Sequence, residues 1–589
     1  MSIKARNHVT SIAFLLIFGL MSVTAFSQTP SLGGSDGLGR VLPQNEQTGD
    51  LKDNRQVALF YFLWQGDPSS KTSERYWDLD ILYREHPEVF EDADHPAWGG
   101  GTGKYYFWGK PIYGYYRGDD YWVHLKNIQL LTDAGVDLLV IDATNRITYF
   151  NQAKTLMQAM QAIRGQGYNP PKIAFYTNTV SGDAMQEIYD SFYKEDAAFR
   201  MQDCWFYLDG KPLIIGISKE AENRNYKDFF TIRESQWPTV PQQANGWPWI
   251  EFKRPQPVYF NQEGEKEIIN VSVAQHPNPG AGMGGSAFYG NKDNWGRSYR
   301  KGHPAIDPEK DILYGFNFQE QWDVVHQQQP LFVFVTGWNE WIAGKWPSHD
   351  NNPEHSWFCD QASPEYSRDI EPTLTAGLQD HYYMQFVQNI RRYKGVAPLP
   401  LLSEKKTIRQ FGDWTDVLPE YTDYTGDVLR RDHPGAESEP LVNYTNETGR
   451  NDFKMMKVAR DNKNVYFYAQ TDRPITPCTG ENWMTLFIDI DRSLQTGWNG
   501  YDFQVTSGNS LQHFAEGEWA ILAMIDFQLD GNELMITIPN KLLGIADSDQ
   551  LNFEFKWSDN RQSDDPMDWY INGDAAPGGR FNFVVLSNK

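Results

Sequence analysis

Between residues 55 and 397 the chain alternates between two hydrophobic patterns. Short runs of consecutive apolar residues, rich in β-branched and aromatic side chains, predict strands that are buried on both faces. Between these runs, apolar residues recur at helical spacing, as in residues 119–134, which an acidic residue begins and Gly135 ends. The repeated order of helix, short turn and buried strand predicts an α/β fold.

Seven strands can be assigned in this region from the apolar runs, and we place an eighth, less regular one near Asp311–Phe316. Eight strands alternating with helices predict a (β/α)8 barrel of the TIM type over residues 55–397. The seven predicted strands are Val57–Trp64, Val136–Ile141, Lys172–Tyr176, Leu213–Ile217, Phe229–Ile232, Ile268–Ala274 and the run that begins at Leu331.

A long irregular segment separates the first predicted strand from residue 119. Loops of this length in a compact domain are usually functional, so we expect it to lie over the mouth of the barrel. Its Tyr113, Tyr115 and Tyr116 would either contact a ligand there or pack the loop onto the barrel.

Pro398 and Pro400 mark a change of pattern. Beyond them, short runs alternate apolar and polar residues, which is the period of a strand with one buried face. These runs and their Asp-Gly and Asn-Gly turns predict an all-β sandwich over residues 398–589. The predicted strands are Val465–Ala469, Met484–Ile490, Tyr501–Val505, Trp519–Ile525, Glu533–Ile538, Leu551–Trp557 and Phe581–Leu586.

Residues 1–27 have the pattern of a signal peptide. Lys4 and Arg6 precede a short apolar stretch, and small residues at positions 25 and 27 offer a cleavage site. The apolar stretch is too short to favour a membrane anchor, and we predict no transmembrane segment. We therefore expect export to the periplasm, the cell surface or the medium. Residues 28–54 are rich in Gly, Ser, Pro and Gln and predict a flexible lead-in.

Charge and composition narrow the expected partners. The 589 residues carry a formal net charge of −24, which disfavours nucleic acid and anionic membranes. The 21 Trp, 31 Tyr and 34 Phe supply flat apolar faces of the kind on which sugar rings stack, so a carbohydrate substrate is the expected partner. The 3 cysteines are widely separated and offer no metal-ligand spacing, and we predict no cofactor for the barrel. The oligomeric state stays open.

The strongest local signal lies in Leu331–Trp346, LFVFVTGWNEWIAGKW. A buried strand gives way to Trp338, Asn339, Glu340 and Trp341, and this end of a barrel strand is where chemistry is carried out. We predict that Glu340 is a catalytic acid/base, because two flanking indoles would desolvate it and favour its protonated form. The alternative is that both indoles are packing residues around a satisfied carboxylate.

Hydrolysis of a glycosidic bond needs a second carboxylate in the same pocket. Asp142 follows the second predicted strand, which a closed barrel brings close to the last one, so we predict that Asp142 is the partner of Glu340. Its alternative role is a carboxylate satisfied by loop amides. For Glu234 the alternative is an ion pair with Arg233 or another cation, and for His276 it is a loop-ordering role. The predicted substrate-binding residues are Trp64, Asn145, Asn178, Glu234, His276, Trp338, Asn339 and Trp341.

Residues 55–397 resemble the barrel proteins of glycoside hydrolase families 71 and 99. The segments VALFYFLW, AGVDLLVIDATN and above all FVTGWNEW carry this resemblance. Family 99, the endo-α-mannosidases and endomannanases, has a similar FNEW segment in which a second Glu follows three positions after the first and acts with it. The first Glu matches Glu340, but the second falls on Ala343. The resemblance therefore implies the fold and a glycosidase-like site, without the catalytic pair of family 99.

Residues 398–589 resemble carbohydrate-binding sandwiches of the family 9 type. The segment Leu486–Phe503, LFIDIDRSLQTGWNGYDF, carries this resemblance. Asp489 and Asp491 alternate on a predicted strand, so their carboxylates share a face and form either a Ca²⁺ site or a solvated strand edge. The tryptophans that include candidate sugar platforms are Trp483, Trp498, Trp519, Trp557 and Trp569.

The leading hypothesis is a secreted glycoside hydrolase that acts on a poly- or oligosaccharide through paired carboxylates. The alternative is a non-catalytic glycan-binding protein on a degenerate barrel, which the alanine at position 343 favours. A glycosyltransferase is disfavoured because no glycine-rich phosphate loop lies between a predicted strand and helix.

Overall fold

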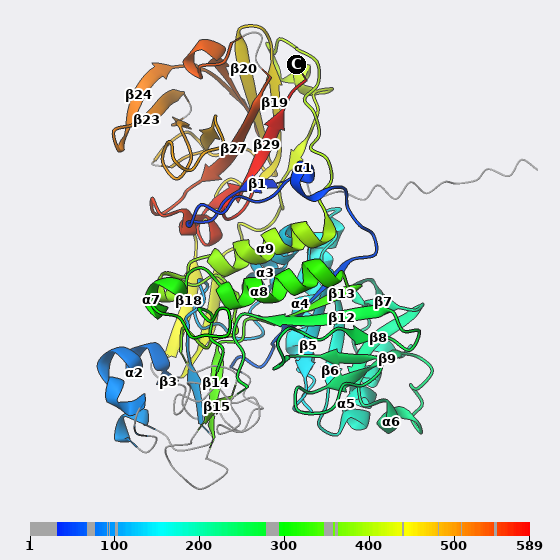
Figure 1. The fold of residues 1–589 in the computed structure, drawn as a ribbon. Coiled ribbons are helices and arrows are strands. Elements are labelled where there is room, and N and C mark those ends of the chain that lie inside the picture. The colour runs from blue at the N-terminus through cyan, green and yellow to red at the C-terminus, as the bar shows by residue number, and fades with distance from the viewer. Residues whose placement is uncertain are drawn as a thin grey trace, which may run out of the picture.

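The structure is a computed structural model with a barrel below and a β-sandwich above it (Figure 1). The prediction of a (β/α)8-type barrel followed by an all-β region is confirmed. The predicted signal peptide lies outside the described residues, so export stays a prediction. The structure describes residues 32–66, 77–90, 92, 95–99, 104–277, 294–346, 357–359, 363–438, 441–480, 482–507, 509–546 and 550–588.

Eight parallel strands of the described chain form the barrel sheet. In order of pairing, the parallel strands are β10 (Gly246–Pro248), β9 (Thr231–Gln236), β8 (Lys211–Gly216), β6 (Lys172–Thr177), β5 (Leu138–Ala143), β2 (Gln56–Tyr61), β13 (Phe332–Trp338) and β12 (Lys266–Ser272). Strand β11 (Tyr259–Phe260) pairs antiparallel with β12 at one edge of this sheet. It nearly closes the ring, because the N–H of Asn245, just before β10 at the other edge, donates to the Phe260 carbonyl at 3.0 Å. A short strand β7 (Tyr207–Leu208) forms a hairpin with β8.

The predicted position of the eighth strand is wrong. Residues 311–316 contain the end of helix α7 (Pro308–Asp311), a turn, and the first residue of α8 (Phe316–Gln328). The additional strand is β10, only three residues long, in a Trp-rich segment where no strand is predicted. The strand predicted at Phe229–Ile232 is also displaced, because β9 continues to Gln236.

Alternation along the strands separates two apolar layers. Phe332 and Phe334 of β13 pack inside the barrel with Phe60 of β2, whereas Val333 and Val335 face the helices. A fully buried side chain of this kind stabilises the fold by about 1.5–3 kcal/mol. The barrel is therefore a packed core, and its chemistry is confined to the strand ends.

Helices cover the outside of the barrel, and α9, α3 and α8 lie between its strands and the sandwich (Figure 1). Helix α3 begins at Asp120, whose carboxylate accepts the N–H groups of Trp122 and Val123, and ends at Gly135 with φ of 82°, as the sequence predicts. The other helices of the barrel are α4 (Phe150–Gly165), α5 (Ser181–Ile188), α6 (Ser218–Ala221) and α9 (His381–Lys394); α3 spans Tyr121–Ala134.

The irregular segment after β2 forms a small sheet beside the barrel mouth. It contributes α2 (Leu79–Glu85), and its strand β4 pairs antiparallel with β14, the strand that directly follows Glu340. The four strands are β15 (Trp357–Cys359), β14 (Ile342–Trp346), β4 (Lys104–Phe107) and β3 (Trp77–Asp78). Tyr115 and Tyr116 pack on Trp341 and Tyr113 packs on Trp122, and all three tyrosines are buried, so they pack the loop onto the barrel.

The sandwich has two antiparallel sheets. One is β1 (Leu32–Gly34), β29 (Phe581–Leu586), β27 (Asn552–Asp559), β21 (Thr485–Asp489), β22 (Phe503–Thr506), β23 (Ser510–Ala515) and β24 (Glu518–Met524), with β28 (Asp574–Ala576) beside β27. The other is β16 (Tyr421–Thr422), β19 (Phe453–Arg460), β20 (Asn464–Thr471), β26 (Glu533–Pro539) and β25 (Asp526–Asp530).

Residues 32–54, expected to be a flexible lead-in, instead join the fold. Strand β1 pairs antiparallel with β29 at the far end of the chain, and the short helix α1 (Asn45–Thr48) follows it. Leu32 and Leu42 are buried, so this segment contributes apolar surface to the core. The sandwich thus contains both ends of the described chain.

A two-stranded hairpin, β17 (Arg431–Ser438) and β18 (Leu441–Asn446), attaches the second half of the chain to the barrel. Arg431 bonds the Asp120 carboxylate at 2.9 Å, and the Tyr444 hydroxyl accepts the Tyr115 N–H at 2.9 Å. None of the helices in the described ranges is both long and apolar enough to cross a membrane.

Candidate functional site

Glu340 lies at the carboxyl end of β13, where the sequence predicts the site, and it is paired with Arg368. Arg368 Nε is 3.1 Å from Glu340 Oε2 and Nη2 is 2.6 Å from Oε1, a bidentate ion pair in which both side chains are 0% exposed. Such a pair is short and charge-assisted, and it favours the ionised carboxylate. The environment of Glu340 therefore includes a buried cation, Arg368, in addition to the two indoles that precede and follow it in the sequence.

Arg368 is placed by the backbone of β13. The Gly337 N–H donates to the Arg368 carbonyl and the Ile370 N–H donates to the Gly337 carbonyl, each at 3.1 Å, so the segment around Arg368 runs beside the end of the strand. The guanidinium lies over the ring of Trp249 at 5.3 Å from its centroid. Stacking on an indole suits a planar guanidinium and further fixes its orientation.

His276 extends this network. Its Nε2 lies 2.9 Å from the Tyr366 carbonyl, which can only accept, so Nε2 donates and Nδ1 is the acceptor for Arg368 Nη1 at 3.4 Å. His276 is fully buried after β12. It orients Arg368 and the Tyr366 loop, and its predicted contact with substrate stays a prediction.

Asn339 uses its amide to bind the backbone of β2. Its Oδ1 accepts the Phe62 N–H at 2.8 Å and its Nδ2 donates to the Phe62 carbonyl at 2.9 Å. Its own N–H donates to Asp369 Oδ1 at 2.9 Å, and its φ of 55° is a left-handed conformation that Asn adopts more readily than most residues. These contacts hold the chain immediately before Glu340; a substrate contact of Asn339 stays a prediction.

The two indoles of the motif are packing residues in this structure. Val335 pairs with Leu59 and Trp338 with Tyr61, so three residues of β13 oppose two of β2 and the strand bulges. The bulge turns Trp338 to the outer layer, where it packs on Tyr383 at 5.9 Å. Trp341 packs among aromatic residues of the insertion, and both indoles are 0% exposed. Their stacking on a sugar would require the site to open.

Asp369 and Glu371 form a second buried acidic pair behind Glu340. Burial raises the pKa of Asp369 to about 7, although the hydrogen bonds that its carboxylate accepts from backbone N–H groups lower the pKa. Burial, and then the neighbouring Asp369, raise the pKa of Glu371 well above its ordinary value. The Tyr116 hydroxyl lies 2.9 Å from Glu371 Oε2. This pair therefore favours at least one protonated carboxyl near neutral pH.

Asp142 lies on the interior side of the mouth. It follows Leu138 and Val140 of β5 at alternate positions, and both of these pack inside the barrel. Its Oδ1 accepts the Thr144 N–H at 3.0 Å, which is the loop-amide contact named as its alternative role. Strand β2 separates β5 from β13, so at about 4.8 Å per strand the two strand ends are about 10 Å apart.

The remaining predicted residues are spread around the same end of the barrel. Asn178 follows β6, and its Oδ1 accepts the Ser235 hydroxyl at 2.9 Å, which links it to β9. Asn145 is exposed after β5, and Trp64 is half-buried after β2, with its ring nearly perpendicular to that of Tyr105 at 5.5 Å. Their substrate contacts stay predictions.

Glu234 lies within β9 instead of beyond its end. Its Oε2 accepts the Ser218 N–H at 3.3 Å, while Arg233 pairs with Glu267 at 2.7 Å. Within the described residues, Glu234 forms no ion pair with Arg233 or with another cation, and its predicted contact with substrate stays a prediction.

Sequence reasoning missed several residues of the site. Arg368 and Asp369 lie in an irregular segment without periodicity, 28 and 29 positions after Glu340. Trp249, next to the short strand β10, packs against Trp237 at 5.3 Å with the rings at 68° and forms an aromatic wall of the mouth. The Trp-rich composition of residues 237–249 is the signal that could have indicated this wall.

In the sandwich, the five tryptophans separate by exposure. Trp483 and Trp557 are core residues at 0% exposure, and Trp569 is also buried. Trp498 and Trp519 are half-buried with ring centroids 6.4 Å apart, and Arg561 lies over Trp498. Asp489, Asp491 and Asp502 each place a carboxylate oxygen within 4.8 Å of the others.

Comparisons with known proteins give a distant structural similarity. No protein-family model and no curated protein matches the chain. Among solved structures, the GH99 endo-α-mannosidase of Bacteroides thetaiotaomicron is 14% identical, with 58% of this chain and 99% of that chain covered and a TM-score of 0.33. Its complex with bis-tris propane is 12% identical, with coverages of 58% and 97% and the same TM-score. At these values the similarity carries no weight in assigning a function.

Proposed function

We propose that the chain is a secreted glycoside hydrolase that acts on a poly- or oligosaccharide at the mouth of the barrel. The observation that carries the proposal is the placement of two carboxylates, Asp142 and Glu340, at the carboxyl ends of β5 and β13 on either side of β2. Aromatic rings of Trp249 and Trp237 stand at the same end, and such surfaces suit sugar rings.

The contacts of the two carboxylates suggest how they would divide the chemistry. Glu340 is held in an ion pair with Arg368, so it suits the ionised role, as base or nucleophile. Asp142 would then protonate the leaving oxygen. If the two side chains lean toward each other from strand ends about 10 Å apart, their carboxyl groups would reach the separation of about 6.5–9.5 Å typical of inverting hydrolases.

The experiment is a hydrolysis assay of purified protein on defined oligosaccharides, with product anomers followed by NMR. Asp142→Asn and Glu340→Gln should each lower kcat at least about 100-fold, because general acid–base groups contribute about 10²–10⁴-fold. Asp228→Asn is the matched control, since Asp228 is exposed before β9 at the opposite end of the barrel. Unchanged hydrolysis in both site variants would refute the proposal.

A glycan-binding barrel without catalysis is the second candidate. The complete burial of the Glu340–Arg368 pair favours it, because a carboxylate closed in this way contributes to folding whether or not it reacts. Binding on a glycan array with no product after prolonged incubation would support this candidate over hydrolysis.

For the sandwich we propose a carbohydrate-binding role of the family 9 type. The half-exposed Trp498 and Trp519 are the ring pair that supports it. The affinity of the whole protein for immobilised polysaccharide should fall in Trp498→Ala while hydrolysis of a small soluble substrate is kept.

A further inference from the structure

Three buried carboxylates converge away from the barrel mouth, where the sandwich meets helix α3. Asp427, Asp452 and Asp574 each offer one oxygen, and these three atoms lie within 4.8 Å of one another. Their exposures are 7%, 8% and 3%. They come from distant parts of the chain, since Asp427 lies between β16 and β17, Asp452 precedes β19, and Asp574 begins β28. The fold, and no local motif, brings them together.

Two of these carboxylates keep an oxygen that no other group in the described ranges satisfies. Asp427 Oδ2 accepts Lys126 Nζ at 3.0 Å and Gln129 Nε2 at 3.1 Å, and Asp452 Oδ2 accepts the Gly426 N–H at 2.7 Å. The Oδ1 atoms of Asp427 and Asp452 are buried and have no hydrogen-bond partner in this part of the chain. Buried polar atoms are rarely left in this state, so a partner is expected for both.

The charges of the group point to a cation as that partner. Lys126 brings one positive charge to three carboxylates, and Asp423, a further buried acid with an unpartnered Oδ2, lies close by. A second ammonium group, that of Lys556, lies near Asp423 and Asp574. The four carboxyl groups still outnumber the two ammonium groups, and buried charges are normally paired or coordinate a metal.

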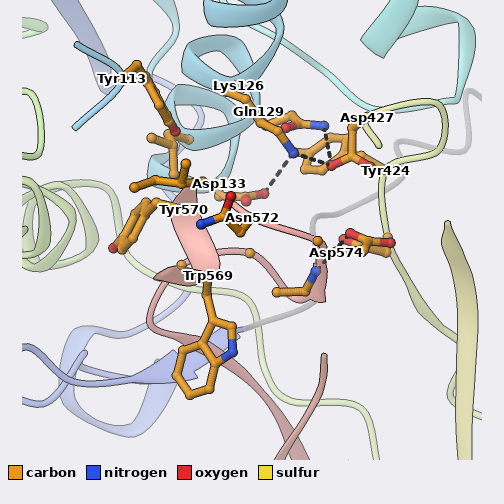
Figure 2. A pocket seen from close by; sticks show the side chains of 17 residues that line it. Tyr113, Lys126, Gln129, Asp133, Tyr424, Asp427, Trp569, Tyr570, Asn572 and Asp574 are labelled. Atoms are coloured by element: carbon orange, nitrogen blue, oxygen red, sulfur yellow. Dashed lines mark hydrogen bonds and ion pairs between the residues drawn. The ribbon is translucent and has the colours of Figure 1, made fainter. Parts of the chain in front are cut away.

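The distances between the carboxylate oxygens and the volume of the adjacent cavity both suit Ca²⁺. Calcium binds oxygens at about 2.3–2.6 Å, so ligands on opposite sides of the ion are about 4.6–5.2 Å apart. Asp427 and Asp574 also line a cavity of about 30 Å³, which is large enough for a water ligand (Figure 2). Asn572 and Gln129 line the same cavity and would add amide oxygens within it.

We propose that Asp427, Asp452 and Asp574 bind one Ca²⁺ ion that fastens the sandwich to helix α3 of the barrel. Asp427 provides the link, because one of its oxygens contacts Lys126 and Gln129 of α3 and the other is buried without a hydrogen-bond partner in the described ranges. Asp574 Oδ2 meanwhile accepts the Phe453 N–H at 2.6 Å, which ties β28 to β19. The ion would hold these three segments in one arrangement, independently of any reaction at the mouth.

The test compares the whole protein with Asp452→Asn after removal of metal with EGTA. Calorimetric titration with CaCl₂ should show one equivalent fewer in Asp452→Asn than in the wild type, and Ca²⁺ should raise the wild-type Tm far more than that of the variant. Asp530→Asn is the matched control, because Asp530 is exposed at the end of β25, belongs to neither acidic group and should keep the equivalent that Asp452→Asn loses.

Several outcomes would overturn the proposal. These are no Ca²⁺ binding by the wild type at millimolar concentration, equal stoichiometry in wild type and Asp452→Asn, or an equal Tm increase with Mg²⁺. If Asp452→Asn does not fold, Asp427→Asn replaces it in the same comparison, and the wild-type titration alone still decides whether an ion binds.

Discussion

Removal of Arg368 tests how the barrel mouth is held together. In Arg368→Met the Glu340 carboxylate would stay in a site of 0% exposure without its cation. Loss of one partner of a buried ion pair costs about 3–5 kcal/mol. The variant also loses the stacking of the guanidinium on Trp249 at 5.3 Å and the contact with His276. We therefore expect a loss at the upper end of that range, about 5 kcal/mol.

The measurement is urea unfolding at 25 °C followed by tryptophan fluorescence. Arg368→Met, Glu340→Gln, the double variant and the wild type together form a double-mutant cycle. With an m-value of about 3 kcal/mol/M, the unfolding midpoint of Arg368→Met should fall by about 1.7 M. The double variant has neither buried charge, so it should be more stable than the sum of the single losses predicts, by about 2–3 kcal/mol.

Additive losses would refute this reasoning. If the double variant loses the sum of the two single effects within about 0.5 kcal/mol, the ion pair is not coupled energetically and the geometry around Glu340 does not depend on Arg368. Arg368→Lys provides a further control, because it keeps the charge but not the bidentate fork or the stacking, and it should recover only part of the stability.

Three further outcomes are expected. Because burial raises the folded-state pKa of Asp369 to about 7, the folded protein retains a proton that the unfolded chain releases near pH 4. The free energy of unfolding should therefore fall as the pH rises from 4 to 7, and Asp369→Asn should flatten that slope in urea titrations. Gly34→Ala places a Cβ 2.4 Å from the Arg580 carbonyl at a φ of +124°, so it should cost about 1–3 kcal/mol and expose the N-terminal strand to limited proteolysis, whereas Gly412→Ala, with no atom within 4 Å of its Cβ, should not. Trp498→Ala should weaken polysaccharide retention in affinity electrophoresis at 25 °C; because its ring also stacks on Phe487 at 5.6 Å, Tm should fall by about 2–4 °C, too little to unfold the variant in the assay.

Much of the fold could be predicted because buried strands and amphipathic helices leave periodic patterns. The strand predicted at Phe581–Leu586 has the same bounds in the structure, and α3 ends at Gly135 as expected. The failures are segments too short to have a period. Strand β10 has three residues, and β1 has three, two of them glycines; both are strands because of the neighbours they pair with, which no local window contains.

The candidate site could be predicted only where one segment carries it. The change from apolar strand to polar residues indicated a carboxylate at the strand end, Glu340, and the strand order placed Asp142 at the same end of the barrel. Arg368 could not be predicted, because its backbone pairing with Gly337 depends on a return of the chain 31 residues later. The outward turn of Trp338 could not be predicted either, since a bulge in β13 reverses the alternation that the sequence implies.

The partner of Glu340 also changes which part of the motif matters. In sequence, the indoles on either side suggest a desolvated, protonated acid. In the structure, those indoles pack away from the mouth, Asn339 and Asp369 fix the backbone before Glu340, and Arg368 engages both of its oxygens. A carboxylate held in this way is built to stay ionised. If the barrel hydrolyses glycosides, the proton donor must therefore come from another strand, and the pH–rate profile should lose its upper pKa in Asp142→Asn but keep it in Arg368→Lys.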